Sequence, residues 1–417
     1  MIIVQFNEAI KELLIKYSNK YDFKFIKKII LQSTNTYSEA KYENLEPWIQ
    51  WVSFYSGKEF NRHKVSKLGE YKYDKDNFFV NLADQGKKIG IFCSMNQYYY
   101  SKFLRYVPDP WSKENSDSSY LSVSLKKITS FLVNKNATLA IPFNLIFNFI
   151  YLILKLPIHK IYYLLIQSLI GIFTKNRSIL AGILDYFLFS LVLKYHQNLK
   201  LDMSAVFLNG LAHVQHHYLF NSEFIKSKNP SWYISAHKDP IKEILPIYEK
   251  IFTELFKSKI NFSVISGLGQ IILNKPEFYW RFKNHEKIFK ILLENIKHIC
   301  IPKMSRDFFL EFNNKSDLIK AKSILNNTYY IIGKKKFNLF GYIEVFDKKL
   351  FGSLTYNHEN DNSTAYYNTT KIELKNKIDF VAIKNSIHDE KGWFFLNTKK
   401  NKISNNLNIW DVSNFLT

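Results

Sequence analysis

Three histidines and an asparagine gather within nine residues of this sequence. The stretch Val206–Tyr218 reads VFLNGLAHVQHHY, in which an apolar run ends at Asn209 and His213, His216 and His217 follow. Imidazole is the commonest protein metal ligand and the usual proton carrier near neutral pH. Because α/β proteins bind ligands at strand ends, the stretch predicts a metal or acid–base site after a buried strand. The alternative interpretation is a strand-to-helix turn whose histidines cap and pack.

Polar residues also follow two other apolar runs, near the two ends of the chain. Asn7 and Glu8 end the first run, Ile2–Phe6, and could bind a sugar hydroxyl or a single cation. A strand-end turn is the alternative. His388 lies in the late stretch SIHDEKGWFF and could hold a cation with His213 or carry protons. Paired structural histidines are the alternative for these two residues.

Glu46 stands immediately before an aromatic stretch that has the signals of a helix. Pro47 suits the first helical turn and Gly57 suits a C-cap. Glu46 could act as a general acid or base, or as a carboxylate nucleophile. The alternative is an acid that interacts with the helix dipole. Trp48 could stack on a sugar ring, although its three-residue spacing from Trp51 favours core packing.

Strands and helices alternate along most of the chain. The run Asp239–Lys257 carries its apolar side chains on one helical face, and the strand-like Ser263–Ser266 follows it. From Tyr329 to Thr370 the pattern shortens to strand-like alternation with Gly and Asn turns. These patterns predict an α/β fold with a mostly parallel sheet sandwiched by helices, a helical insertion and a small antiparallel excursion.

The expected organisation has five segments. Residues 1–119 form the first part of the α/β core, 120–200 a helical insertion or cap, 201–300 the second part of the core, 301–377 a small antiparallel subdomain, and 378–417 the end of the core with His388.

The composition limits the class of partner and the compartment. The formal net charge of +22 favours anionic partners, and the helical insertion could contact an anionic membrane surface peripherally. The lysines are spread along the chain without zinc-finger spacing or an aromatic–basic signature, so nucleic-acid binding is not indicated. Cys93 and Cys300 are far apart, which suits a reducing compartment, and the start of the chain lacks the pattern of a secretory signal. We expect a cytoplasmic protein that can lie at the inner membrane surface.

Taken in order, these motifs resemble the alkaline phosphatase superfamily, in particular its type I phosphodiesterase/nucleotide pyrophosphatase branch. Asn7 falls at that family's first metal-ligating Asp, and Asn209 with His213 has the spacing of its Asp-x-x-x-His pair. Gly57 and His63 match its glycine and the later histidine, Gly267 and Leu268 fall at its Asp-His pair, and His388 with Gly392 matches its late histidine. The resemblance implies an alkaline-phosphatase-like fold over most of the chain.

The sequence departs from the family pattern where the metals would bind. In that family two divalent ions, commonly zinc, polarise the phosphoryl group and activate the nucleophile. Here one site would retain Asn209, His213 and His388, whereas Gly267 and Leu268 offer the other site no ligating side chain. The nucleophile position falls near Pro47, which cannot attack phosphorus. The resemblance therefore implies one divalent cation, zinc if any, or none.

The resemblance and the residues together lead to two hypotheses. The first is a hydrolase or transferase that acts on a phosphorylated or glycan-linked anionic substrate, in a surface-polysaccharide or glycolipid pathway. Its candidate catalytic residues are Glu46, His213 and His388, and its candidate substrate contacts are Asn7, Glu8, Trp48, His63, His217 and Arg281. The second is a non-catalytic binding or scaffold relative that has lost the two-metal site. The first hypothesis requires Asn7, Glu46, Asn209, His213 and His388 to converge within about 8 Å.

Overall fold

The protein folds into two compact units. The computed structural model describes residues 1–39, 45–134, 142–302, 306–398 and 406–416. Unit 1 comprises Met1–Ile272 with Ser386–Thr417, and unit 2 comprises Leu273–Asn385. Unit 2 begins before and ends after the predicted antiparallel segment, 301–377, because two long strands carry the chain between the units. These strands are β6 (Phe262–Phe282) and β15 (Ile378–Asp389).

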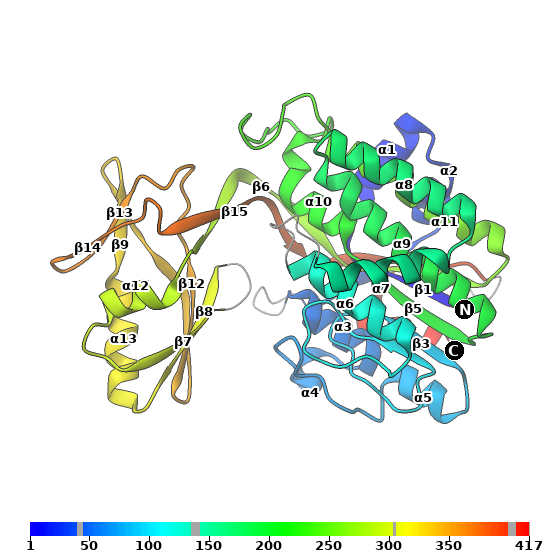
Figure 1. Ribbon diagram of the computed structural model, residues 1–417, viewed down its shortest axis with the longest axis horizontal. Coiled ribbons are helices and arrows are strands. Elements are labelled where there is room, and N and C mark those ends of the chain that lie inside the picture. The colour runs from blue at the N-terminus through cyan, green and yellow to red at the C-terminus, as the bar shows by residue number, and fades with distance from the viewer. Residues whose placement is uncertain (40–44, 135–141, 303–305, 399–405, 417) are drawn as a thin grey trace. The chain divides into compact units, whose positions relative to one another are not determined.

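Unit 1 is built on a mostly parallel sheet, as the sequence predicts (Figure 1). Its strands lie in the order β17 (Asn406–Asn408), β2 (Thr34–Tyr37), β16 (Lys391–Leu396), β6, β1 (Ile2–Glu8), β5 (Met203–Leu208), β3 (Ile89–Phe92) and β4 (Arg105–Val107), and β15 also pairs with β6. β1 is parallel to both of its neighbours, β5 and β6, whereas β16 is antiparallel to β6 and β2. Every residue of β1 and of β5 is buried, which is typical of strands covered on both faces.

Helices cover both faces of this sheet. They are α1 (Lys11–Tyr21), α2 (Lys24–Leu31), α3 (Pro47–Ser56), α4 (Phe60–His63), α5 (Phe78–Asp84), α6 (Tyr120–Asn134), α7 (Phe143–Leu154), α8 (Ile158–Phe173), α9 (Arg177–Asn198), α10 (Gly210–Tyr218) and α11 (Pro240–Ser258). Phe6 of β1 packs edge-on against Tyr248 of α11, and Phe207 of β5 packs against Trp51 of α3. Because the register pairs Phe6 with Leu208, Phe6 and Phe207 point to opposite faces, so α11 and α3 cover opposite sides.

Helix α3 confirms the predicted start and end of the aromatic helix. Pro47 occupies its first turn, and Gly57 closes it in the left-handed conformation with φ of 65°. The strand expected at Ser263–Ser266 is longer than predicted, because Gly267 continues β6 and does not end it.

Unit 2 contains the predicted antiparallel excursion. One sheet has the order β10 (Lys335–Asn338), β9 (Tyr329–Ile332), β13 (Thr364–Tyr367), β14 (Thr370–Glu373), and a second has the order β11 (Phe340–Phe346), β12 (Lys349–Leu354), β8 (Asp307–Phe312), β7 (His298–Pro302). Helices α12 (His285–Leu292) and α13 (Lys315–Asn327) accompany them. Unit 2 has its own apolar core, which includes Phe308, Leu310 and Leu325.

Among the described residues, α9 alone has the length and apolar composition of a membrane-spanning helix. Most of its apolar window, 67%, is buried within the protein. It packs against β5, α8, α10 and α11, which is the setting of a core helix.

Candidate metal centre

Glu8, His216 and His388 form a compact group in unit 1. Their ligand atoms all lie within 4.8 Å of one another. Glu8 Oε2 is 2.7 Å from His216 Nε2, and Glu8 Oε1 is 3.3 Å from His388 Nε2. The carboxylate is almost fully buried, whereas both imidazoles are partly exposed. Two nitrogens and one oxygen can therefore converge on one point that is accessible from solvent.

The topology of the sheet brings these residues together. Glu8 is the last residue of β1, and α10 begins directly after β5, the parallel neighbour of β1. Gln215 of α10 fixes the helix to the end of β1: its Oε1 accepts from Ile10 N at 3.1 Å and its Nε2 donates to Glu8 O at 3.3 Å. His216, the next residue of the helix, thereby reaches the Glu8 carboxylate.

Hydrogen bonds behind the two imidazoles fix their tautomers. His388 Nδ1 lies 2.6 Å from Leu45 O, and a carbonyl oxygen only accepts, so Nδ1 carries a proton. The Ser386 hydroxyl donates to Gln270 Oε1 at 2.8 Å and therefore accepts from His216 Nδ1, which is 3.3 Å away. Each imidazole thus presents Nε2 to Glu8. Metal-ligating histidines in proteins are oriented by this kind of hydrogen bond to the second ring nitrogen.

The carboxylate of Glu8 is held in its ionised form. Burial by itself would raise its pKa, but His216 and His388 outweigh this effect and hold the pKa of Glu8 well below its usual range. Gln270 Nε2 donates to Oε2 at 2.5 Å and Asn7 Nδ2 donates to Oε1 at 3.0 Å. With Nδ1 protonated, a lone pair on each Nε2 faces this negative charge unless a proton or a cation lies between them. Protons on the Nε2 atoms make these contacts ion pairs, and a divalent cation such as zinc, which takes imidazole and carboxylate ligands, can replace these protons.

Glu46 lies on the other side of the His388 ring. Its Oε2 is 3.7 Å from His388 Nδ1, and it occupies the position immediately before α3. The structure therefore gathers three residues that the sequence singled out, Glu8, Glu46 and His388, and Asn7 adjoins them through its contact with Glu8.

His213 and Asn209 are arranged differently from the predicted metal set of Asn209, His213 and His388. His213 is absent from the ligand group, and its ring packs edge-on against that of His217 with centroids 4.7 Å apart. Burial, with a contribution from His216, lowers the pKa of His213 to about 4. The backbone N–H of Asn209 donates to Asp185 Oδ1, and the Asn209 Oδ1 atom is buried without a hydrogen-bond partner among the described residues.

Helix geometry explains this difference. Ala212 and His216 are four residues apart and share one face of α10, and the Ala212 carbonyl accepts from Gln270, which also contacts Glu8. His213 and His217 form the next stripe round the helix. The sequence contained this signal in its spacing, but the spacing alone does not show which stripe meets β1.

The remaining predicted substrate contacts lie in other surroundings. His63 joins α4 to α3: its Nδ1 accepts from Val65 N and its Nε2 lies 3.0 Å from Ser53 Oγ. The indole of Trp48 donates to Ser66 O at 3.0 Å. Arg281 belongs to unit 2, at the end of β6. The contacts of Ser386 with His216 and of Gln270 with Glu8 were not predicted, because they depend on pairing between distant strands.

Fold and site together define an α/β protein with a candidate cation site at the carboxyl end of its parallel strands. Comparisons of the sequence with family models and with curated proteins find no match. Among solved structures, it is similar to phosphonoacetate hydrolase from Sinorhizobium meliloti 1021 in complex with phosphonoformate, with 9% identity, a TM-score of 0.44, and coverage of 99% of this chain and 94% of that one. It is also similar to murine ectonucleotide pyrophosphatase/phosphodiesterase 5, with 9% identity, a TM-score of 0.43, and coverage of 100% and 93%.

The name of the second protein includes the nucleotide pyrophosphatase/phosphodiesterase branch that the sequence motifs resemble. At this identity and TM-score the similarity concerns the path of the backbone and carries no argument about function. The chemistry of the site is argued from its own side chains.

Proposed function

We propose that this protein binds one divalent cation through Glu8, His216 and His388 and acts as a hydrolase or transferase on an anionic substrate. The observation that carries the proposal is the pair of imidazoles anchored at Nδ1 that present Nε2 to one buried, ionised carboxylate. Zinc suits this set of two nitrogens and one carboxylate, which leaves room for water or substrate. When bound, such a cation polarises a phosphoryl or carbonyl oxygen and lowers the pKa of bound water.

The substrate that we propose is phosphorylated or glycan-linked. The net charge of +22 raises the local concentration of anions around the protein. Glu46 is half-exposed beside His388, so it can exchange a proton with solvent and serve as the general acid or base.

A non-catalytic binding protein is the second candidate. Asn7, Asn209, Gly267 and Leu268 stand where the resemblance implies charged or imidazole ligands, and the described residues contain one candidate ligand group. A protein with this single site could hold a cation and an anion without turnover.

Metal binding by two variants of one helix tests the proposal. His216→Ala removes a proposed ligand, whereas His213→Ala removes an imidazole one turn earlier that lies outside the group. We expect wild type to bind one equivalent of zinc, His216→Ala to bind at least tenfold more weakly, and His213→Ala to match wild type. Zinc titration of purified, chelator-treated protein measures this. Absence of stoichiometric binding, or loss in His213→Ala alone, would contradict the proposal.

Glu46→Gln separates the two candidate functions. An enzyme should lose turnover of a phosphodiester such as bis(p-nitrophenyl) phosphate in this variant while zinc affinity is retained. The second candidate, a non-catalytic binding protein, is supported if metal-loaded wild type binds anions but does not turn over phosphomonoesters, phosphodiesters or activated glycosides.

A further inference from the structure

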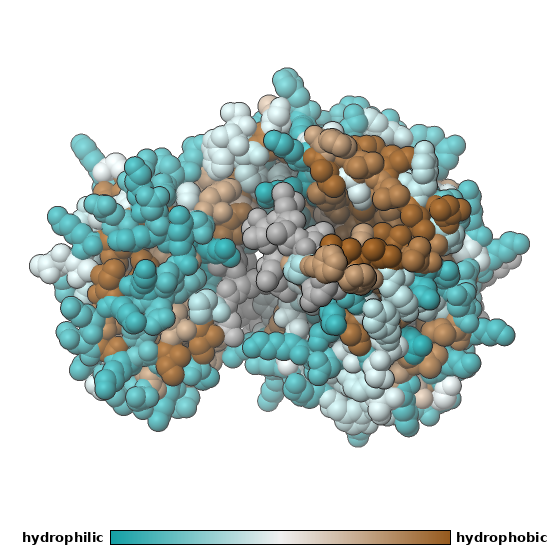
Figure 2. Space-filling model, in the orientation of Figure 1, coloured by the Kyte–Doolittle hydropathy of each residue, from teal (hydrophilic) through white to brown (hydrophobic). Residues whose placement is uncertain are grey.

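Most of the exposed side chains on α7 and α8 are apolar. On α7 the exposed stripe is Phe143, Ile146, Phe147, Ile150 and Leu154, and on α8 it is Ile158, Tyr162, Leu165, Leu169, Ile172 and Phe173. The exposed fraction reaches 73% at Phe143 and 81% at Phe173. Figure 2 shows the resulting hydrophobic surface, which coincides with α7 and α8 in Figure 1. A continuous surface of this kind on a soluble unit marks an interaction site.

Two polar side chains of the same helices, Asn148 and Lys160, point inward, whereas His159 in the first turn of α8 is exposed. Asn148 of α7 is 7% exposed and accepts from Ser124 Oγ at 2.8 Å, and Lys160 of α8 is 8% exposed and pairs with Glu254 at 2.5 Å. A surface helix of a soluble protein has the opposite arrangement, with its apolar stripe on the core and its polar face in water. The outward stripe therefore suits an apolar environment.

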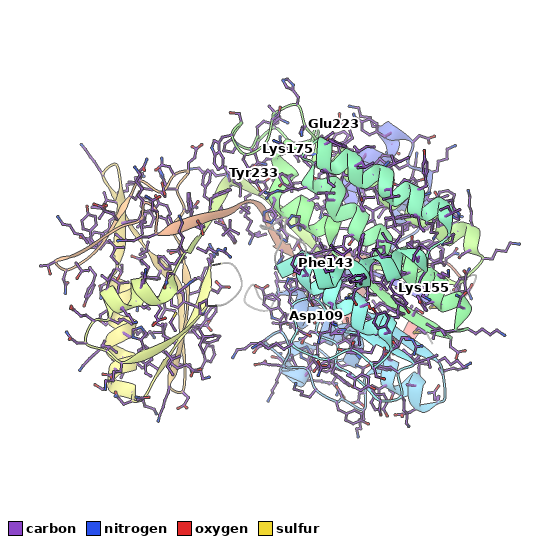
Figure 3. The ribbon with its side chains drawn as sticks, in the orientation of Figure 1. Asp109, Phe143, Lys155, Lys175, Glu223 and Tyr233 are labelled. Carbon is purple, nitrogen blue, oxygen red and sulfur yellow. The ribbon has the colours of Figure 1, made fainter. Side chains whose placement is uncertain are left out.

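The segment that carries this surface has basic residues and no acidic ones. No Asp or Glu occurs between Asp117 and Asp185, whereas that interval contains seven Lys or Arg residues. Lys155 follows the end of α7, and Lys175 and Arg177 follow the end of α8. Figure 3 shows Phe143 and Lys155 at opposite ends of α7, with Lys175 beyond the end of α8.

We propose that the α7–α8 surface docks on a membrane whose headgroups are anionic. The apolar stripe would enter the acyl boundary while the lysines and Arg177 pair with lipid phosphates and carboxylates. The helices have 12 and 16 residues, fewer than the roughly 20 that a span requires, so they lie in the plane of the interface. A second copy of this chain fits the surface less well, because it would bring two basic rims together.

Vesicle cosedimentation of the full chain tests the docking. The probes are phosphatidylcholine vesicles with and without phosphatidylserine, at low and at raised ionic strength. We expect binding to the anionic vesicles that weakens as salt screens the charges. The stripe variant Phe147→Glu, Leu165→Glu, Phe173→Glu, which places three charges on the exposed apolar stripes, should bind at least tenfold more weakly than wild type. The matched control, Leu31→Glu, Tyr73→Glu, Ile319→Glu, makes the same charge change at exposed apolar residues elsewhere and should retain most of the binding.

A second variant keeps the apolar stripe and removes the basic residues. Lys155→Gln, Lys175→Gln, Arg177→Gln should weaken binding roughly fivefold per residue and leave the thermal unfolding of the protein unchanged. The proposal fails if wild type binds neither vesicle or if the stripe and control variants lose binding equally. It also fails if sedimentation shows a wild-type dimer that the stripe variant alone abolishes, which would assign the surface to a second copy. All of these measurements are independent of zinc binding and turnover.

Discussion

Ser386→Ala isolates the contribution of one hydroxyl to the candidate metal centre. Ser386 bridges His216 Nδ1 and Gln270 Oε1, and its side chain is fully buried. Loss of a hydrogen bond behind a ligating histidine lowers metal affinity about 10- to 100-fold. That corresponds to about 1.4–2.7 kcal/mol of binding free energy. The buried Gln270 oxygen also loses its donor, which should lower the unfolding free energy of the metal-free protein by about 1–3 kcal/mol.

Two measurements on the same variant separate these effects. Competition with a chromophoric chelator gives the zinc affinity, and urea unfolding of metal-free protein gives the stability. Ser56→Ala is the matched control, because Ser56 is also buried but donates to Val52 O within α3, away from the metal group. We expect its zinc affinity to equal that of wild type. If Ser386→Ala binds zinc within twofold of wild type, the Ser386 hydrogen bond does not orient His216 as a ligand and the argument for this centre is refuted.

Two further predictions concern stability. Burial lowers the pKa of His196 to about 4 from 6.5, so the unfolded chain binds a proton there that the folded chain does not, and stability falls as pH falls through this window. Between about pH 7 and pH 5 the free energy of unfolding should fall by about 2 kcal/mol because of this residue. Urea titrations at several pH values should show a smaller dependence of the unfolding free energy on pH for His196→Gln than for wild type. An equal pH dependence in the two proteins would show that His196 is not the cause. Gly392→Ala should destabilise unit 1 by about 1–3 kcal/mol or more, because its Cβ would lie 2.2 Å from Ser266 O and 2.7 Å from Thr36 Oγ1. An unchanged melting temperature would show that β16 can shift.

Local signals predicted some elements well and misplaced others. Pro47 and Gly57 gave the limits of α3 because each restricts or permits the backbone at its own position. The strand predicted at Ser263–Ser266 does not stop before Gly267, because β6 continues through this residue. A Cβ at Gly267 would lie 3.2 Å from the Trp51 ring, so this glycine serves packing against α3 and not a turn. Contacts between elements far apart in sequence are not encoded in the local pattern.

The candidate site was predicted in part for the same reason. The position of Glu8 at the end of a predicted strand singles out this residue, and the resemblance to the family singles out His388. The likeness also pointed to His213, because it matched a spacing in sequence, whereas the phase of α10 against β1 selects His216. The bridge from Ser386 to Gln270 joins residues 116 positions apart and becomes visible only in the folded chain.

The way the chain enters and leaves unit 2 makes this unit an insertion between two paired strands. The chain leaves unit 1 on β6 and returns on β15, and these two strands pair with each other. The order of the remaining strands in the parallel sheet does not depend on what lies between them. Loop-closure entropy grows slowly with loop length, so this connection can lengthen at small cost. Unit 2 is therefore a separable insert: a short turn that joins β6 to β15 in its place should leave the parallel sheet of unit 1 intact.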